Sequence, residues 1–240
     1  MKIWINGASR GLGYDILRAL DSSDHELVAL TSFPLELEHF SNIKVIDKGI
    51  VISEIGEIVI KSIQDYGFPD VVIHTSGGGL GVKSPNINFE MFNSVFYKNF
   101  GHIIEINHSL ISQNKESNEL KIIHIGSTAA RQAIGSVSYN VAKSSLDSYV
   151  RSAGNQIQDK SIVLCGINLG AYLGFENSME RLRKSNRLEY DKFINEKLPL
   201  GKMMTIDSIF PLINFLISSN ISSLRGSMIP VDSGESKAYD

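Results

Sequence analysis

The chain has only one cysteine, Cys165, among its 240 residues. A single thiol excludes a disulfide within the chain and suits a reducing compartment. The sequence also lacks any run of 18 apolar residues, so no segment of it predicts a membrane-spanning helix. Residues 2–6 are already strand-like and lead straight into a glycine turn, which leaves no room for a signal peptide. We therefore expect a cytoplasmic protein.

An excess of either charge is also missing, since 23 basic and 26 acidic residues give a net charge of -3. This balance gives no reason to expect nucleic acid or an acidic membrane as a partner. Internal repeats, low-complexity tracts and linkers are absent too. A hydrophobic content of 42% and 240 residues are sufficient for one buried core. We expect a single domain over residues 1–240.

Short apolar runs alternate along the chain with segments whose apolar residues recur at helical spacing. Such alternation predicts an α/β fold, in which a parallel sheet carries helices on both faces. The expected architecture is a doubly wound (Rossmann) sheet of about seven strands. The expected strands are 2–5, 27–30, 43–46, 71–73, 120–125, 161–167 and 227–231, and the expected helices are 12–20, 50–66, 88–113, 137–157 and 206–219.

The first glycine turn, residues 6–13, lies between a predicted strand and a predicted helix. In that context, backbone amides at the start of the helix can hold a phosphate. Gly7 would permit the tight turn, whereas Gly11 and Gly13 would allow the backbone to approach a pyrophosphate. The spacing is G-x-x-x-G-x-G, and the Lys-Ser/Thr pair of a P-loop is missing. A glycine turn without a ligand is the alternative.

The end of the second strand bears on the choice of dinucleotide. An acidic residue there would pair with the ribose of NAD, but Thr31 and Ser32 occupy the place. Arg10 in the first turn could reach a 2′-phosphate. These features favour NADP(H) over NAD(H), while a solvated surface charge is the alternative interpretation of Arg10.

For two further polar residues, His74 and Asn99, a purely structural role is an alternative to a functional one. His74 opens a second glycine turn, His74–Gly81, but no second ligand is spaced to join it, so we expect a packed or turn-bonded histidine and no metal site. Asn99 lies within a predicted helix and is either a structural hydrogen-bonding residue or a polar group of the site.

Tyr139 and Lys143 lie four residues apart in a predicted helix and so share one face. A nearby ammonium favours the phenolate, so we expect it to lower the pKa of the phenol from its usual value of about 10. Such a tyrosine can donate a proton to a substrate oxygen. Ser127, twelve residues before the tyrosine, could hold the same oxygen. A tyrosine packed at the edge of an exposed helix is the alternative.

Residues 171–200 differ from the rest of the chain, because basic and acidic side chains mix there with few apolar ones. This composition predicts one or two exposed helices. We expect either a substrate lid or a plain solvated insertion.

Together these features resemble the short-chain dehydrogenase/reductase family, in particular its 3-oxoacyl-carrier-protein reductase-like group. The resemblance covers nearly the whole chain, and its specificity comes from the joint order of the motifs. The matching features are the turn at 6–13, Asp47, the turn at 74–77, Asn99, Ser127, Tyr139, Lys143, Gly170 and the closing segment 226–234.

The resemblance implies a role for each matching residue. Tyr139 would donate and accept the proton, Lys143 would lower its pKa and bond the nicotinamide ribose, Ser127 would orient the carbonyl, and Asn99 would hold a water. The residues implied to bind the cofactor are Gly7, Ser9, Arg10, Gly11, Leu12 and Gly13 at the pyrophosphate, Thr31 and Ser32 near the 2′-phosphate, Asp47 at the adenine and Gly77 at its ribose, together with Tyr139 and Lys143.

Several positions depart from the family pattern. Asn6 stands where threonine is usual, and His74-Thr75-Ser76-Gly77 replaces Asn-Asn-Ala-Gly, so the hydrogen bonds between these strands must differ. Leu169 replaces a proline. Gly174 replaces a threonine that often bonds the nicotinamide carboxamide, which affects how the nicotinamide is positioned.

The resemblance implies an NADPH-dependent oxidoreductase that interconverts a carbonyl and an alcohol of a small molecule. The substrate could be an acyl thioester, a sugar derivative or another carbonyl compound, and either direction is open. The alternative is a nucleotide-binding protein without turnover, acting as a sensor or assembly partner. The resemblance also implies a homodimer or homotetramer.

Overall fold

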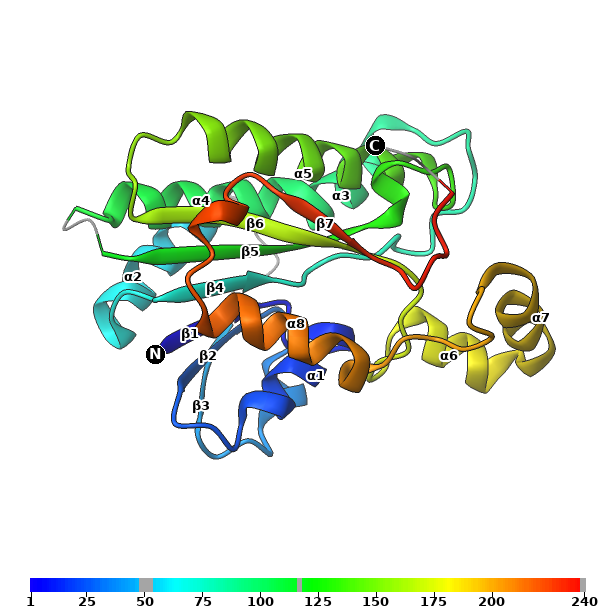
Figure 1. The fold of residues 1–240 in the computed structure, drawn as a ribbon, viewed down its shortest axis with the longest axis horizontal. Helices are drawn as coiled ribbons and strands as arrows, with labels where there is room; N and C mark the ends of the chain where they lie inside the picture. Colours follow the sequence, from blue (N-terminus) through cyan, green and yellow to red (C-terminus); the bar gives the residue numbers. More distant parts are fainter. Residues whose placement is uncertain (48–53, 116–117, 238–240) are drawn as a thin grey trace.

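The computed structural model describes residues 1–47, 54–115 and 118–237. Seven strands form one sheet in the order β3-β2-β1-β4-β5-β6-β7, and each neighbouring pair is parallel (Figure 1). The strands are β1 (Lys2–Asn6), β2 (Glu26–Thr31), β3 (Ile43–Asp47), β4 (Val71–His74), β5 (Leu120–Ser127), β6 (Ile162–Leu169) and β7 (Met228–Val231). The doubly wound α/β fold expected from the sequence is confirmed.

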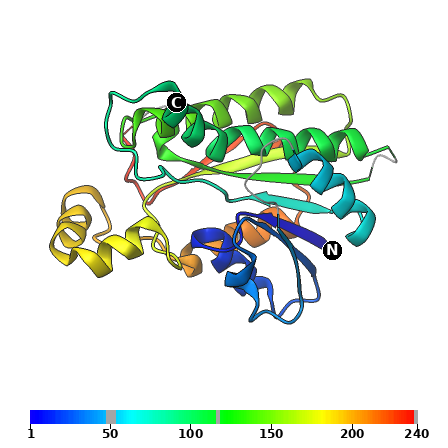
Figure 2. The same ribbon diagram turned by 180° about the vertical axis from the view of Figure 1, so that it is seen from behind.

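Helices cover both faces of this sheet. Figures 1 and 2 show α2, α3, α4 and α5 over one face, α1 and α8 over the other, and α6 and α7 projecting beyond the sheet. The helices are α1 (Gly11–Leu20), α2 (Ile55–Tyr66), α3 (Phe89–Phe96), α4 (His102–Gln113), α5 (Val137–Gln156), α6 (Ser178–Ser185), α7 (Arg187–Lys197) and α8 (Ile206–Ser218). Among the described residues, no helix has both the length and the apolar character to cross a membrane.

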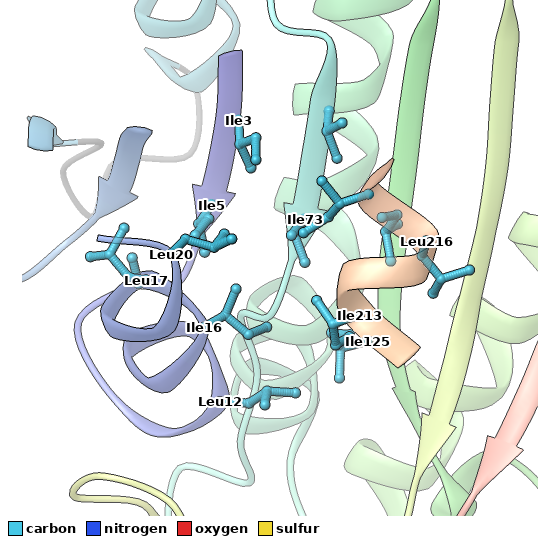
Figure 3. Packing of buried hydrophobic residues seen from close by; sticks show 14 of the residues in the cluster. Ile3, Ile5, Leu12, Ile16, Leu17, Leu20, Ile73, Ile125, Ile213 and Leu216 are labelled. Carbon is cyan, nitrogen blue, oxygen red and sulfur yellow. The ribbon is translucent and has the colours of Figure 1, made fainter. Parts of the chain in front are cut away.

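Burial on both faces of β1 explains why its sequence is continuously apolar. Ile3 and Ile5 pack with α1 and α8, as Figure 3 shows, whereas Trp4 belongs to the cluster on the opposite face. Successive strand residues point to opposite faces, so a strand covered on both sides needs apolar residues at every position. Burying each such side chain contributes roughly 1.5–3 kcal/mol.

The segment predicted as one helix over 88–113 is interrupted. A π turn, η3 (Tyr97–Gly101), separates α3 from α4. The predicted helix over 88–113 is therefore present over 89–113, and the unforeseen feature is this π turn, which carries the buried Asn99. A π turn adds one residue to the helical repeat and is common at functional sites. Part of another prediction, the helix over 50–66, lies outside the described residues.

The strand order positions the candidate site. β1 lies between β2 and β4, so the chain leaves β1 toward one edge of the sheet and returns on its other side at β4. In open α/β sheets the crevice at such a switch, outside the carboxyl ends of the strands, binds ligands. The two glycine turns follow β1 and β4 and so meet at this crevice.

Candidate active site

The two glycine turns contact each other through their backbones. Thr75 donates from its amide to the Asn6 carbonyl over 2.9 Å and from its hydroxyl to the Gly7 carbonyl over 3.2 Å. A Cβ at Gly7 would lie 2.6 Å from the Ser76 hydroxyl oxygen, and one at Gly13 would lie 2.3 Å from Thr75 Oγ1. Any larger residue at either position would separate the turns.

The start of α1 suits a phosphate group. Among the described side chains, none caps the helix, whose N-cap residue is Arg10. An uncapped N-terminus presents backbone N–H groups and a positive partial charge to an anion. One of these donors is already used, because the Gly11 amide bonds the Phe175 carbonyl over 2.6 Å. The cradle of glycines and the open helix end fit a dinucleotide pyrophosphate.

Arg10 is held by two groups that the sequence did not single out. Its guanidinium lies 3.1 Å from the Glu36 carboxylate and 4.9 Å from the centre of the Phe33 ring. The Phe33 amide donates to the Thr31 hydroxyl, so the chain turns immediately after β2. An acidic residue therefore does lie near the end of β2, but it is Glu36, five residues after Thr31. In the sequence, Pro34 was the residue that could have indicated this turn, because it begins the short helix Pro34–Leu37 that contains Glu36.

The remaining predicted cofactor residues gather at the same edge of the sheet. Thr31 is buried and lies opposite the exposed Asp47 in the β2–β3 ladder. Ser32 follows Thr31 directly, and Ser9 and Leu12 are buried in the first turn. Their contacts with adenine and phosphate stay predictions.

The predicted proton-transfer residues come together at the carboxyl ends of the central strands. Ser127 ends β5, and its hydroxyl lies close enough to the Tyr139 hydroxyl on α5 to favour the phenolate. Lys143, one helical turn further on, is 4% exposed, and its Nζ lies 5.9 Å from the centre of the Tyr139 ring. The backbone of Tyr139 is fixed by the α5 N-cap, since its amide donates to Ser136 Oγ. A hydroxyl pair beside a buried amine can hold and protonate an oxygen atom.

The predicted direction of the Tyr139 pKa is wrong for the protein alone. Burial raises the pKa of Tyr139, and the hydrogen bond from Ser127 only opposes this effect. Burial also lowers the pKa of Lys143 to about 8, because a buried ammonium loses its hydration. Burial thus disfavours both charged forms, the phenolate of Tyr139 and the ammonium of Lys143. The spacing in the sequence predicted that the two side chains are close together, but it did not predict the free-energy cost of burying both charged forms.

Asn99 fastens the second glycine turn to the π turn. Its side chain accepts from the Gly78 amide over 2.9 Å and donates to the carbonyls of Gly78 and Val95. A Cβ at Gly77 would lie 2.8 Å from Asn99 Oδ1 and 3.4 Å from Lys143 Nζ. Gly77 therefore sits between the asparagine and the lysine. The expected role of Asn99 in holding a water stays a prediction.

Three basic side chains from separate elements interact electrostatically, although the Glu36 carboxylate pairs with one of them, Arg10. Lys98 on the π turn is partly buried, and burial together with the charges of Arg10 and Arg181 lowers its pKa. Arg10 comes from the first glycine turn and Arg181 from α6, so three separate elements contribute cations. Their combined field favours an anionic ligand.

A buried network of imidazoles and amides lies among β1, β4, β5 and α4, and sequence reasoning missed it. The Asn6 amide nitrogen bonds His74 Nδ1 over 3.0 Å and His102 Nε2 over 3.2 Å. An amide nitrogen only donates, so both imidazoles accept at these atoms and are neutral. His74 then donates to Asn107, which donates to His124 Nε2 over 3.0 Å. The expectation of a packed, bonded His74 is confirmed. In the part of the chain that is described, no three His, Cys, Asp or Glu side chains are arranged to hold a metal ion.

The segment over 171–200 forms two helices, α6 and α7, as expected. Its first residues return to α1, where Tyr172 donates to the Asp15 carboxylate over 2.6 Å. A Cβ at Gly174 would lie 2.3 Å from the Tyr172 ring and 2.5 Å from Asp15 Oδ2. A threonine at this position has no room. The sequence showed the glycine at position 174, but it did not show that Tyr172 and Asp15 fill the space beside it.

This fold and this arrangement of turns define the class of α/β proteins that bind a dinucleotide at a glycine-rich strand end. The family profile described as Enoyl-(Acyl carrier protein) reductase matches residues 52–236. The chain belongs to the short-chain dehydrogenase/reductase family, whose members are NAD(P)-dependent oxidoreductases of CH–OH and C=O groups. The family expected from the sequence is confirmed.

Individual relatives agree with this assignment. The chain is 27% identical to the 3-oxoacyl-acyl-carrier-protein reductase FabG of Buchnera aphidicola, over 96% of this chain and 95% of that protein. A 4-hydroxyisoleucine dehydrogenase mutant complexed with NADH and succinate is similar in structure, with a TM-score of 0.88, 17% identity and full coverage of both chains. L-sorbose reductase from Gluconobacter frateurii, complexed with NADPH and L-sorbose, gives a TM-score of 0.83 at 18% identity over 99% of this chain and 97% of that chain.

Proposed function

We propose that the protein is an NADPH-dependent reductase that interconverts a carbonyl and an alcohol, with Tyr139 as the proton donor. The observation that carries the proposal is the neighbouring hydroxyls of Ser127 and Tyr139, with the buried Lys143 Nζ 5.9 Å from the centre of the Tyr139 ring. A binding protein without turnover has no chemical need for this set. The proposed organisation is one domain over 1–240 with a substrate lid at 171–200.

Each residue has a defined task in this mechanism. The bound nicotinamide supplies the hydride. Ser127 donates a hydrogen bond to the substrate oxygen and holds it beside the Tyr139 hydroxyl, which transfers its proton to that oxygen. Burial raises the pKa of Tyr139, so the phenol is protonated at neutral pH, which suits the direction of reduction. Lys143, with a pKa of about 8, supplies a positive charge close to the phenolate that remains.

Two features bear on the choice of cofactor. Arg10 offers a cation for a 2′-phosphate, and Lys98 and Arg181 add to the positive field. Glu36 opposes this preference, because its carboxylate already occupies the Arg10 guanidinium. NADP(H) is the proposed cofactor, and the exposed ion pair with Glu36 costs part of the selectivity. The solved neighbours include complexes of both kinds, one with NADH and one with NADPH.

The substrate is a small carbonyl or alcohol compound. The relatives include a 3-oxoacyl-acyl-carrier-protein reductase and a reductase of L-sorbose, so they leave the substrate class open within this range. A homodimer or homotetramer is proposed, supported by β7 at the edge of the sheet and by a surface hollow along α5 lined by Phe100, Val141 and Tyr149. A cytoplasmic location and the absence of nucleic-acid and membrane partners stay predictions from the sequence.

The experiment that tests the function is oxidation of NADPH and NADH, side by side, with a panel of thioester, sugar and simple carbonyl substrates. We expect turnover that is faster with NADPH and is lost in Tyr139→Phe, because that variant has no proton to donate. If Tyr139→Phe oxidised NADPH as fast as the wild type, the proton donor would be wrong. Binding of a dinucleotide without turnover on any substrate would favour the sensor alternative. Light scattering that gave a monomer at micromolar concentration would contradict the oligomer.

A further inference from the structure

The proposed lid is connected to the sheet by two short chain segments that pair with each other. Tyr172 and Met204 form a parallel bridge, in which Leu173 donates to the Met204 carbonyl over 2.9 Å and Met204 donates to the Ala171 carbonyl over 3.2 Å. The lid also has an apolar cluster of its own, around Tyr190. Figure 2 shows α6 and α7 well outside the layers of the sheet. The lid is thus a small unit whose placement depends on contacts near these paired segments.

Those contacts are made with α1 and the first glycine turn. The Asp15 carboxylate accepts hydrogen bonds from the Tyr172 hydroxyl over 2.6 Å and from the Phe175 amide over 3.2 Å. The Phe175 ring stacks on Tyr14 with centres 4.0 Å apart, and its carbonyl accepts from the Gly11 amide. Four interactions, from both backbone and side chains, therefore converge on residues 172–175.

Of these four interactions, the hydrogen bond between Asp15 and Tyr172 is the one that we expect to contribute most to holding the lid in place. An O–H donor to a carboxylate at 2.6 Å is a short, charge-assisted hydrogen bond. Burial raises the pKa of Asp15, and the bond itself acts in the opposite direction. The pair also occupies the space where a Cβ of residue 174 would lie. A threonine side chain and this pair exclude each other.

We propose that Asp15 and Tyr172 are positioning residues that clasp the lid to α1, the helix that begins in the first glycine turn, in place of the lid side chain that Gly174 lacks. The clasp joins two parts of the chain directly, so it holds the lid in place before a dinucleotide binds. A lid that is already ordered loses less conformational freedom on binding, which strengthens the affinity. The consequence for the reaction rests on the proposed function, whereas the clasp itself does not.

The first test measures the lid in the protein without dinucleotide. Hydrogen–deuterium exchange of the amides in 173–203 is compared among the wild type, Tyr172→Phe, Asp15→Ala and their double variant. We expect exchange to be roughly tenfold faster in each single variant, since one or two hydrogen bonds are lost. The double variant should exchange no faster than Asp15→Ala, because both changes remove the same bond. The matched control is Tyr190→Phe, which removes a hydroxyl from the lid's own cluster and should exchange like the wild type.

The second test measures affinity. We expect Tyr172→Phe and Asp15→Ala to bind NADPH several-fold more weakly, mainly through faster dissociation, while the urea midpoint of Tyr172→Phe stays that of the wild type. Unchanged lid exchange in both single variants, or an equal increase in Tyr190→Phe, would overturn the clasp. If the wild type bound no dinucleotide, the proposed function would fail, and the exchange data would still decide whether the clasp exists.

Discussion

Lys143 donates a hydrogen bond of 3.0 Å to the main-chain carbonyl of Ile125, so the amine of α5 is tied to the strand that delivers Ser127. The lysine is thereby oriented by the sheet and not only by its own helix. Its burial, however, lowers its pKa to about 8, which means that the folded protein holds this proton less tightly than the unfolded chain does. Burying this lysine therefore costs stability, as is common for groups kept for a function.

Lys143→Met should consequently stabilise the protein while it abolishes turnover. At pH 7 the buried ammonium costs about 3 kcal/mol, and losing the Ile125 bond returns part of it, so we expect a gain of about 2 kcal/mol in the free energy of unfolding. Between pH 8 and 10.5 the unfolded chain binds the proton that the folded chain has released, so wild-type stability rises with pH. The gap to Lys143→Met should narrow there. Urea unfolding at pH 7 and pH 10 measures both effects, and the exposed Lys44→Met is the control.

The buried histidine network predicts a loss of stability in acid. Burial lowers the pKa of His124 from its usual 6.5 to about 4. The contribution of neutral His124 is fully present above pH 6.5 and is lost as the pH falls toward 4, because the unfolded chain takes up the proton first. We expect a loss of about 3 kcal/mol over this range.

Urea unfolding between pH 4 and 7 measures the loss, and NMR titration of labelled histidines identifies its source. One imidazole, that of His124, should have a pKa near 4, and replacing the exposed His108 in His108→Gln is the control variant. A His124 that titrated near 6.5 would contradict the assigned network.

Gly77→Ala should disturb the turn that connects Asn99 and Lys143. The added Cβ would lie 2.8 Å from Asn99 Oδ1, so the asparagine has to move away from Gly78. We expect a loss of about 1–3 kcal/mol in the free energy of unfolding, together with roughly tenfold weaker dinucleotide binding. Gly79→Ala is the matched control, because a Cβ there meets nothing within 4 Å. Equal effects of the two substitutions would show that the turn, and not the Asn99 contact, is sensitive.

Glu36→Gln should increase the preference for NADPH. The change releases Arg10 from an exposed ion pair whose strength is about 0.2–1 kcal/mol, so NADPH should bind roughly two- to fivefold more tightly and NADH should not. Dissociation constants for both dinucleotides, measured by fluorescence titration, test this expectation. Glu38→Gln removes the same charge from the same turn without touching the Arg10 pair and serves as the control. Tighter binding of NADH in Glu36→Gln would mean that Arg10 does not read the 2′-phosphate.

The sequence predicted those parts of the molecule that depend on neighbours along the chain. The alternation of strands and helices, both glycine turns and the shared face of Tyr139 and Lys143 follow from local spacing. The fold class follows from them, because a βαβ connection has one favoured hand and alternating elements leave few topologies.

The rest depends on partners far apart in the sequence. Asp15 and Tyr172 are 157 residues apart, and Asn6 and His102 are 96 apart, so no local pattern relates them. The pKa of Tyr139 was predicted in the wrong direction because burial is set by the whole fold, whereas helical spacing shows only the nearest charge. The π turn was missed for a similar reason: its signal is a single extra residue in an otherwise regular apolar pattern.

The bridge between Tyr172 and Met204 has a consequence for how such proteins diversify. The chain leaves the sheet at Tyr172 and returns at Met204, so the roughly thirty residues between them are connected to the sheet at one paired junction. The packing of helices on the sheet does not include these residues. In its proposed role as a lid, this segment could be lengthened, shortened or exchanged to alter what enters the crevice, provided that the junction and its attachment to Asp15 are kept. Recombination among relatives would then change specificity without the need to invent a new fold.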